Sequence, residues 1–435
     1  MIDATENTPT RPMNERNDTS ASSAYRSYVL GVLLVMYVFN YMDRYVLTQM
    51  ITPIKADLGV SDTMVGFLMG PAFAVFYTLC GIPIARLADV RSRRSIIAIG
   101  FFVWSLFTAG SGLAKSAVQL AIMRTLVGVG EAAGAAPAHS LISDYFPPAR
   151  RATALAIFQC GVPIGSMLGL ILGGFLVDAI GWRSTLVAVG LPGIAVALLL
   201  WLTVREPERG AMETTTREEV PRATMREVVK TLSGKPTFWA IALGAGIASF
   251  AGTGFGFWMP EFLGRVHDMS RVEIGLRFGI ISSVANVVGV IICARVTDAL
   301  GARDLRWYSY AGALSIAMML PFLGLTLLWP DGRQAIYFMI PSGLLGGAWA
   351  PIAFSMGQNI APPHMRATAA ALIILFVTLL GQGVGPLAVG YVTDLLEPQY
   401  GVLAIRWSLL SILATCSIGA IFFAASARSI RRDYL

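Results

Sequence analysis

Twelve long apolar runs dominate the 435-residue chain and limit what it can fold into. A helix needs about 20 mostly apolar residues to cross the hydrocarbon core of a bilayer. Only 14% of the residues are charged and the mean hydropathy is +0.65, so too few charges remain to cover a soluble surface. The sequence therefore predicts an all-α membrane protein with twelve transmembrane helices. The runs lie near 28–51, 62–84, 95–114, 117–142, 150–179, 184–204, 237–260, 274–296, 307–328, 335–360, 367–394 and 404–427.

One long polar interruption, 205–236, divides the runs into six plus six. We therefore expect an N-terminal six-helix bundle over 27–204, a cytoplasmic linker over 205–236 and a C-terminal six-helix bundle over 237–428. Residues 1–26 are rich in Thr, Asn, Ser and Asp and are expected to form a disordered cytoplasmic tail, and 429–435 form a second tail. Residues 225–232 of the linker could form a short amphipathic helix on the membrane surface.

The distribution of Lys and Arg predicts the orientation, because these residues concentrate in cytoplasmic loops. Of the 33 Lys and Arg, 23 lie in the tails, the linker and the loops on the same side as the tails. Two lie within spans, and eight lie on the other side: Lys55, Lys115, Arg183, Arg265, Arg271, Arg277, Arg333 and Arg406. Both termini are therefore expected in the cytoplasm, with the protein in the plasma membrane (the inner membrane of a bacterium). The net charge of +7 then reflects topology, so we expect no nucleic-acid partner.

An internal repeat relates the two halves. The segment 85–89 with Arg94 returns 209 residues later as 294–298 with Arg303. Farther along, at an offset of 216, a second set of positions matches: Gly165, Gly169, Gly174 and Asp178 correspond to Gly381, Gly385, Gly390 and Asp394. Parallel repeats of this kind are typical of transporters that rock two bundles around a central site. We therefore expect two pseudo-symmetric bundles.

Four charged residues lie well inside predicted spans, away from the ends of the runs, where each costs at least about 2.5–3.5 kcal/mol on insertion scales. They are Asp43 and Arg44 in the first run and Arg124 and Glu131 in the fourth. Arg124 and Glu131 are seven residues apart, which places them on one face of a helix. The structural interpretation is a salt-bridge network that locks the two helices together. The functional interpretation, which we favour, adds that one carboxylate exchanges a proton during a transport cycle.

The functional interpretation assigns roles to these residues. Asp43 is the first choice for proton coupling because Arg44 follows it directly, and Glu131 is the second. Arg124 is the first choice for holding an anionic head group, because its planar guanidinium suits phosphate or carboxylate. Glu131 would then alternate with the substrate as the partner of Arg124. Arg44 and the preceding Asn40 and Tyr41 are further candidates for substrate binding.

The loop after the second run is rich in charge. Asp89, Arg91, Arg93 and Arg94 are either anchors that follow the positive-inside rule or part of a gating cluster of ion pairs between helices. The repeat favours gating, because Asp298 and Arg303 return in the second half.

An enzyme is the weaker alternative. His139 and Asp144 have the H-x4-D spacing of glycerolipid acyltransferases, but this is a two-residue match at the end of a span. The chain has no spacing typical of metal ligands and no nucleotide-binding loop, so we expect neither a cofactor nor a metal.

Together these motifs resemble the major facilitator superfamily and, more narrowly, its spinster-like branch. The superfamily loop pattern G-x-L-x-D-R-x-G-R-R maps onto 85–94, with departures at Ala85, Val90 and Ser92. The likeness to the spinster-like branch rests on the segments 40–45, 124–132, 144–146, 163–166 with Gly169, and 182–183.

This resemblance implies a monomeric secondary transporter that works by alternating access and is coupled to protons. It also implies an amphiphilic, lipid-like anion as substrate, of the lysophospholipid or sphingoid-phosphate type, with membrane lipids as further partners. An exporter of small organic anions or drugs with the same fold is the alternative. A sensor that does not transport is more remote.

Overall fold

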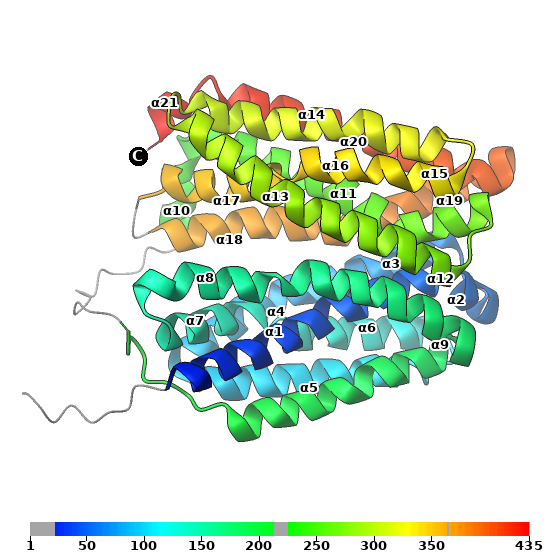
Figure 1. Cartoon of the computed structure of the whole chain (residues 1–435), viewed down its shortest axis with the longest axis horizontal. Coiled ribbons are helices and arrows are strands. Elements are labelled where there is room, and N and C mark those ends of the chain that lie inside the picture. Colours follow the sequence, from blue (N-terminus) through cyan, green and yellow to red (C-terminus); the bar gives the residue numbers. More distant parts are fainter. Residues whose placement is uncertain (1–21, 213–224, 363–364, 435) are drawn as a thin grey trace, which may run out of the picture.

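The computed structural model describes residues 22–212, 225–362 and 365–434, so the predicted tail up to residue 21 and the middle of the linker lie outside the described residues. The described residues form helices and no strands. The helices lie in two bundles, one from each half of the chain (Figure 1). Helix α1 begins and helix α21 ends at the same end of the molecule, which we call the terminal end. The other end is the distal end.

The first bundle contains α1 to α9. Helix α1 begins at Ser23, where the side chain of Ser22 accepts a hydrogen bond from the amide of Tyr25. The predicted tail is therefore wrong at 23–26, because the cap starts the helix earlier. The bounds are α1 (Ser23–Val46), α2 (Ile51–Leu58), α3 (Asp62–Met69), α4 (Pro71–Val90), α5 (Arg93–Ser111), α6 (Ala117–Glu131), α7 (Ala135–Tyr145), α8 (Pro148–Gln159) and α9 (Gly161–Thr203).

The second bundle contains α11 to α20. It is preceded by the short helix α10 (Met225–Ser233), which covers the predicted amphipathic segment and buries Val228 and Leu232. The further bounds are α11 (Pro236–His267), α12 (Arg271–Ile274), α13 (Ile280–Gly301), α14 (Arg306–Leu328), α15 (Gly332–Ala335), α16 (Met339–Gly346), α17 (Trp349–Ile360), α18 (Arg366–Phe376), α19 (Gly385–Tyr400), α20 (Ala404–Ser426) and α21 (Ile430–Asp433).

Nine helical stretches of the described chain are long and apolar enough to cross a membrane. Two of them, of 56 and 59 residues, are far longer than one crossing requires. They reverse at Gly181 and Gly401, whose φ angles of 76° and 53° suit a residue without a side chain. The stretch 117–145 is not among the nine because residues 132–134 separate α6 from α7. Each of the twelve predicted runs thus has a helical counterpart, and the predicted all-α membrane fold is confirmed.

The bundles touch most closely near the distal end, through glycines related by the internal repeat. A β-carbon on Gly66 of α3 would lie 2.5 Å from the carbonyl oxygen of Pro386 in α19. At the counterpart position, a β-carbon on Gly275 would lie 2.6 Å from the carbonyl oxygen of Leu170 in α9. The absence of side chains at these positions allows helix backbones to approach directly. One apolar core accordingly extends from the second bundle into the distal part of the first, including Val65, Leu170 and Val389.

Candidate functional site

Four buried charges form the centre of the molecule. Asp43 and Arg44 come from α1, and Arg124 and Glu131 from α6; their exposed fractions are 1%, 8%, 2% and 1%. Arg124 Nη1 lies 2.9 Å from Asp43 Oδ2, and Arg44 Nη2 lies 2.5 Å from Glu131 Oε2. Arg44 Nε also donates to Glu131 Oε2, at 3.0 Å. Each pair joins the two helices, as buried charges require partners.

This pairing differs from the expected one. The sequence places Arg124 and Glu131 on one helix face, which suggested that they would be partners. In the structure each reaches across to α1 instead. Asp43 and Arg44 are consecutive, so their side chains leave α1 about 100° apart and reach different turns of α6.

Arg44 also connects the two bundles. Its Nη1 donates to Oε1 of Gln382 in the second bundle, at 2.9 Å. Its guanidinium lies 4.4 Å from the ring centroid of Phe73 and 5.0 Å from that of Tyr41, within the range of cation–π attraction. Asn40, one turn before Arg44, is buried. The structure therefore gathers Asn40, Tyr41 and Arg44 around one position on α1.

A small cavity lies beside these pairs, with a volume of about 10 Å³. That is room for about one water molecule. Both guanidiniums face it, together with side chains from both bundles: it is lined by Arg44, Leu47, Met69, Phe73, Arg124, Phe257 and Gln382. Three buried atoms of the charged pairs have no hydrogen-bond partner: Asp43 Oδ1, Glu131 Oε1 and Arg124 Nε. In this conformation the site has room for at most about one water molecule, so an anionic group could enter only if the bundles separate here.

At the terminal end, Arg93 is the centre of a second cluster. Its guanidinium, 1% exposed, forms an ion pair with Asp144 of α7 and contacts Oε1 of Glu206 at 2.8 Å. Glu206 follows α9 and accepts from the backbone amide of Arg94 at 2.8 Å and from the hydroxyl of Ser92 at 3.0 Å. The carboxylate of Glu206 therefore sits over the N-terminus of α5, where the helix dipole favours negative charge.

The linker residues next to Glu206 continue this attachment. Arg209 donates to the carbonyl oxygens of Ala88 and Arg91 at the end of α4, both at 2.8 Å. The amide of Gly210 donates to Asp144 at 3.1 Å. Residues 206–210 thus tie the start of the linker to the charged loop of the first bundle.

This arrangement brings together only part of the predicted gating set. Arg93 and Arg94 contact Glu206, whereas Asp89 and Arg91 are exposed at the end of α4. Asp298 and Arg303 border a cavity in the second bundle. The roles of Asp144 and Glu206 were not predicted. The E-P-x-R pattern directly after the sixth run was the signal available for Glu206 and Arg209.

The cluster predicts a stability effect that depends on pH. Burial alone would raise the pKa of Glu206. The hydrogen bonds from Arg94, Arg93 and Ser92 lower the pKa by more than burial raises it, so the net pKa lies below its usual range. Ionised Glu206 therefore stabilises the fold above about pH 4.3, and this contribution is lost as the pH falls through the lowered pKa. Because the side chain is 27% exposed, we expect Glu206→Gln to cost about 1–2 kcal/mol at pH 7.

Thermal unfolding of purified protein between pH 3 and pH 8 measures this effect. The difference between wild type and Glu206→Gln should disappear at the acid end. Glu208→Gln, at an exposed position two residues away, is the control and should match wild type throughout. A difference for Glu206→Gln that does not change with pH would contradict the assignment.

At the distal end, ion pairs that the sequence analysis did not predict join the bundles. Asp62, at the start of α3, is fully buried. Its carboxylate accepts from Lys55 Nζ at 2.6 Å and from both terminal nitrogens of Arg265 in α11, each at 2.7 Å. Arg265 also pairs with Glu261, which accepts a hydrogen bond from Thr52 of α2.

Two aspartates at corresponding positions of the internal repeat make further bonds between the bundles at the distal end. The carboxylate of Asp394 in α19 accepts hydrogen bonds from the backbone amides of Asp62 and Thr63 at the start of α3, at 3.0 and 2.7 Å. Asp178 of α9 pairs with Arg271 at the start of α12, at 2.7 Å. The sequence repeat relates these two positions, and the folded chain shows that each aspartate bonds to the opposite bundle. We call these contacts, with Arg265, the distal gate.

The acyltransferase alternative has no support in the geometry. Both carboxylate oxygens of Asp144 are occupied, by Arg93 and by the amide of Gly210. The Nε2 atom of His139 is buried without a partner, and its ring packs edge-on against Phe158. Over the part of the chain that the structure describes, no group of three or more His, Cys, Asp or Glu could hold a metal ion.

Comparison with known proteins agrees with this architecture. The family model of the Major Facilitator Superfamily matches residues 33–386. An MFS-type efflux pump of Mycolicibacterium smegmatis is 31% identical over 93% of this chain and 94% of its own. Protein spinster homolog 1 of Rattus norvegicus is 29% identical over 95% of this chain and 83% of its own. A similar solved structure is the crystal structure of a bacterial homolog of the human lysosomal transporter Spinster, in an inward-facing and unoccupied conformation. Its sequence is 29% identical, and the match covers 95% of this chain and 99% of that chain. The two structures superpose with a TM-score of 0.86.

Proposed function

The chain belongs to the major facilitator superfamily and is a transporter of the spinster type rather than an enzyme; from this premise we propose that it is a proton-coupled secondary transporter of an amphiphilic anion. The substrate class is of the lysophospholipid or sphingoid-phosphate type. This class is what the resemblance to the spinster-like branch implies, and relatives named spinster are among the proteins similar to this chain. No cofactor takes part in this proposal.

The observation that carries the proposal is the continuous bonding from Glu131 through Arg44 to Gln382. It couples a buried carboxylate in one bundle to a side chain of the other through a single guanidinium. Movement of the bundles that draws Arg44 away would leave the charge of Glu131 without its cation, which favours proton uptake. Glu131 therefore becomes the first choice for the proton carrier. Asp43, whose partner Arg124 is not part of this chain of bonds to Gln382, becomes the second.

The anionic head group would bind where both guanidiniums face the central cavity. Arg44 and Arg124 supply forked donors that match phosphate or carboxylate oxygens. Tyr41 and Asn40 would border the same position. Once the bundles separate, Phe73 and Phe257 of the cavity wall offer apolar contacts for the adjoining part of an amphiphile.

Reconstitution into sealed liposomes tests this proposal directly. We expect wild-type protein to accumulate a labelled lysophospholipid or sphingoid phosphate when a pH gradient is imposed. Glu131→Gln keeps the shape of the side chain and removes its titration. It should abolish gradient-driven accumulation while preserving exchange of labelled for unlabelled substrate across the membrane.

Asp43→Asn is the matched comparison, since it neutralises the other buried carboxylate. A larger defect in Asp43→Asn than in Glu131→Gln would return the first choice to Asp43. Equal stimulation of wild type and both variants by the pH gradient would refute proton coupling through these residues.

The charged residues of the terminal end would act as a gate. Asp89, Arg91, Arg93 and Arg94 of the first bundle would meet Asp298 and Arg303 of the second when this end closes. The distal gate would open at the same time. The match to an inward-facing structure supports a conformation that is open toward the cytoplasm.

This assignment of the gates requires both termini to lie in the cytoplasm. The protein would lie in the inner membrane of a bacterium and would work as a monomer. In protein freed of its four native cysteines, we would introduce Glu208→Cys in the linker or Gln399→Cys at the distal end, both at exposed positions. A thiol reagent that cannot cross membranes should label intact cells only at position 399. Labelling at position 208 instead would reverse the orientation.

A second candidate function is export of small organic anions or drugs. The efflux pump that is 31% identical to this chain favours it. Including such compounds in the liposome panel separates the two candidates: a drug exporter would move them and leave the lysolipids untouched.

A further inference from the structure

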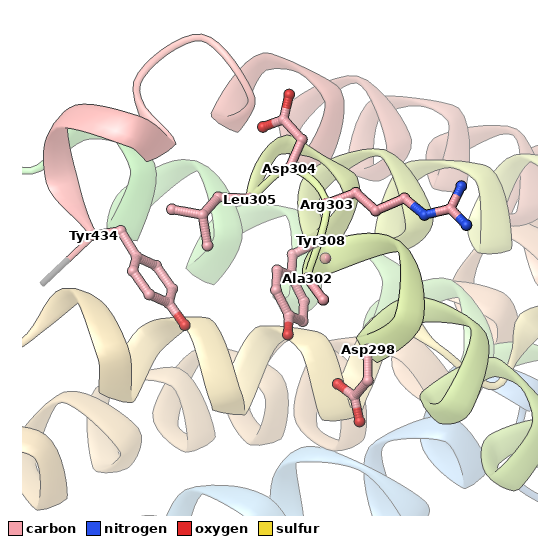
Figure 2. A pocket seen from close by; sticks show the side chains of 8 residues that line it. Asp298, Ala302, Arg303, Asp304, Leu305, Tyr308 and Tyr434 are labelled. Carbon is pink, nitrogen blue, oxygen red and sulfur yellow. The ribbon is translucent and has the colours of Figure 1, made fainter.

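A cavity of about 410 Å³ opens at the terminal end of the second bundle, away from the central site. It is formed by the end of α13, the turn into α14 and Tyr434 after α21 (Figure 2). Its lining comprises Asp298, Gly301, Ala302, Arg303, Asp304, Leu305, Tyr308 and Tyr434. The cavity is large enough for a small organic molecule.

Two tyrosines and a carboxylate dominate its interior. The rings of Tyr308 and Tyr434 stand on the same side of the turn, and their hydroxyls point the same way (Figure 2). The phenol of Tyr308 interacts with the carboxylate of Asp298, and the hydroxyl of Tyr434 accepts from Asn359 at 3.0 Å. Aromatic faces beside a carboxylate are the combination that attracts an organic cation.

The other two charges of the lining are directed elsewhere. The side chain of Arg303 extends away from the tyrosines in Figure 2. The carboxylate of Asp304 is held by Arg431 at 2.6 Å and by the amide of Arg306 at 3.0 Å. Asp298 is therefore the charged group of the lining that interacts with one of the two tyrosines, Tyr308.

The internal repeat gives an independent indication of what the cavity accepts. Ala302 corresponds to Arg93, 209 residues earlier, whose buried guanidinium fills the equivalent part of the first bundle. A second guanidinium, from Arg209, binds the carbonyls at the end of α4, the counterpart of the end of α13. At the position equivalent to Arg93, Ala302 contributes only a methyl group. The second bundle's own guanidiniums at this turn do not replace that of Arg93, because Arg303 extends away from the tyrosines and Arg431 binds Asp304.

We propose that this cavity binds an organic cation of the guanidinium or alkylammonium type. Asp298 would hold the charge, and the rings of Tyr308 and Tyr434 would pack against it. The partly negative end of α13 adds to the attraction. A free amine and the ammonium head of phosphatidylethanolamine share this chemistry. The site lies apart from the central charges and does not rest on the proposed transport function.

Thiol reactivity at position 302 tests the proposal without a transport assay. In protein freed of native cysteines we would introduce Ala302→Cys, an exposed position in the cavity wall. It would be reacted with two methanethiosulfonates of similar size, one carrying trimethylammonium and one carrying sulfonate. With rates normalised to a free thiol, the cationic reagent should react about threefold faster or more. Adding Asp298→Asn should remove the preference, and Asp331→Asn at the distal end should not.

Protection by ligands then shows binding. Guanidinium chloride at millimolar concentration and constant ionic strength should slow modification in a manner that depends on Asp298, whereas urea, its neutral analogue, should not. Slower modification in nanodiscs of phosphatidylethanolamine than in those of phosphatidylglycerol would identify a lipid as the source. Protection by guanidinium or ethylammonium in both discs alike would identify a free cation. Equal rates for both reagents, or a preference that survives Asp298→Asn, would overturn the proposal.

Discussion

Arg44→Ala is expected to abolish transport and to lower the free energy of unfolding by about 3–5 kcal/mol, because it leaves Glu131 buried without its cation. The same change removes the bond to Gln382 and the stacking on Phe73. Arg44→Lys should also be poor: one ammonium cannot reproduce the separate donors to Glu131 and to Gln382. Unfolding measurements and substrate titrations on purified variants provide both readouts.

A double variant separates stability from function. Arg44→Gln combined with Glu131→Gln replaces the ion pair with two neutral amides that can bond to each other, so much of the lost stability should return. Anion binding should not return. Titration with a charged and an uncharged amphiphile of equal chain length completes the test. If Arg44 holds the head group, the double variant should lose affinity for the charged ligand alone, and equal losses for both would make Arg44 structural.

Arg265→Ala is expected to release the distal gate. The change removes the bidentate contact with Asp62 and the ion pair with Glu261, both of which are buried carboxylates. Truncating one partner of a desolvated charge pair typically costs about 2–5 kcal/mol. Since Asp62 belongs to the first bundle and Arg265 to the second, this loss weakens the closed distal end. Conformations that are open at that end should therefore become more populated.

Spin labels on Ala56 and Glu397, exposed positions near the gate in different bundles, report the opening. The distance distribution between them should broaden toward longer values in Arg265→Ala. Arg333→Ala is the matched control, because it breaks an ion pair with Glu273 at the same end but within one bundle. An unchanged distribution in Arg265→Ala, or an equal shift in the control, would mean that Arg265 does not hold the distal gate closed.

Hydrophobic length and the repeat were sufficient to predict the twelve helices and the two bundles. Asp43, Arg44, Arg124 and Glu131 could also be identified, because charge inside an apolar run is conspicuous in a sequence. Their pairing could not be predicted, since it depends on how far α1 and α6 are rotated relative to each other. The rotation is set by packing over both helices rather than by the four residues.

The distal gate could not be predicted from the sequence, for a different reason. Asp62, Arg265 and Arg271 lie at the ends of apolar runs, where charged residues are common and serve only to end a span. Nothing in the sequence distinguishes such residues from those that bond across an interface between distant segments. Glu206 was missed likewise, because it lies in a linker that was read as a connection rather than as a part of the first bundle.

As long as the distal gate stays closed, the glycine contacts between α3 and α19, and between α9 and the start of the second bundle's second span, would act as a pivot for opening the terminal end. If the bundles rotate about this pivot, a lever arm of about 30 Å, the thickness of the hydrocarbon core, separates it from the terminal ends. A rotation of about 10° would then displace those ends by about 5 Å, and the midpoint by about half as much. That displacement at the midpoint would be enough to break the bond of 2.9 Å between Arg44 and Gln382. A side chain of one methyl group at Gly66 or Gly275 would shift the pivot and, with it, the angle at which that bond breaks.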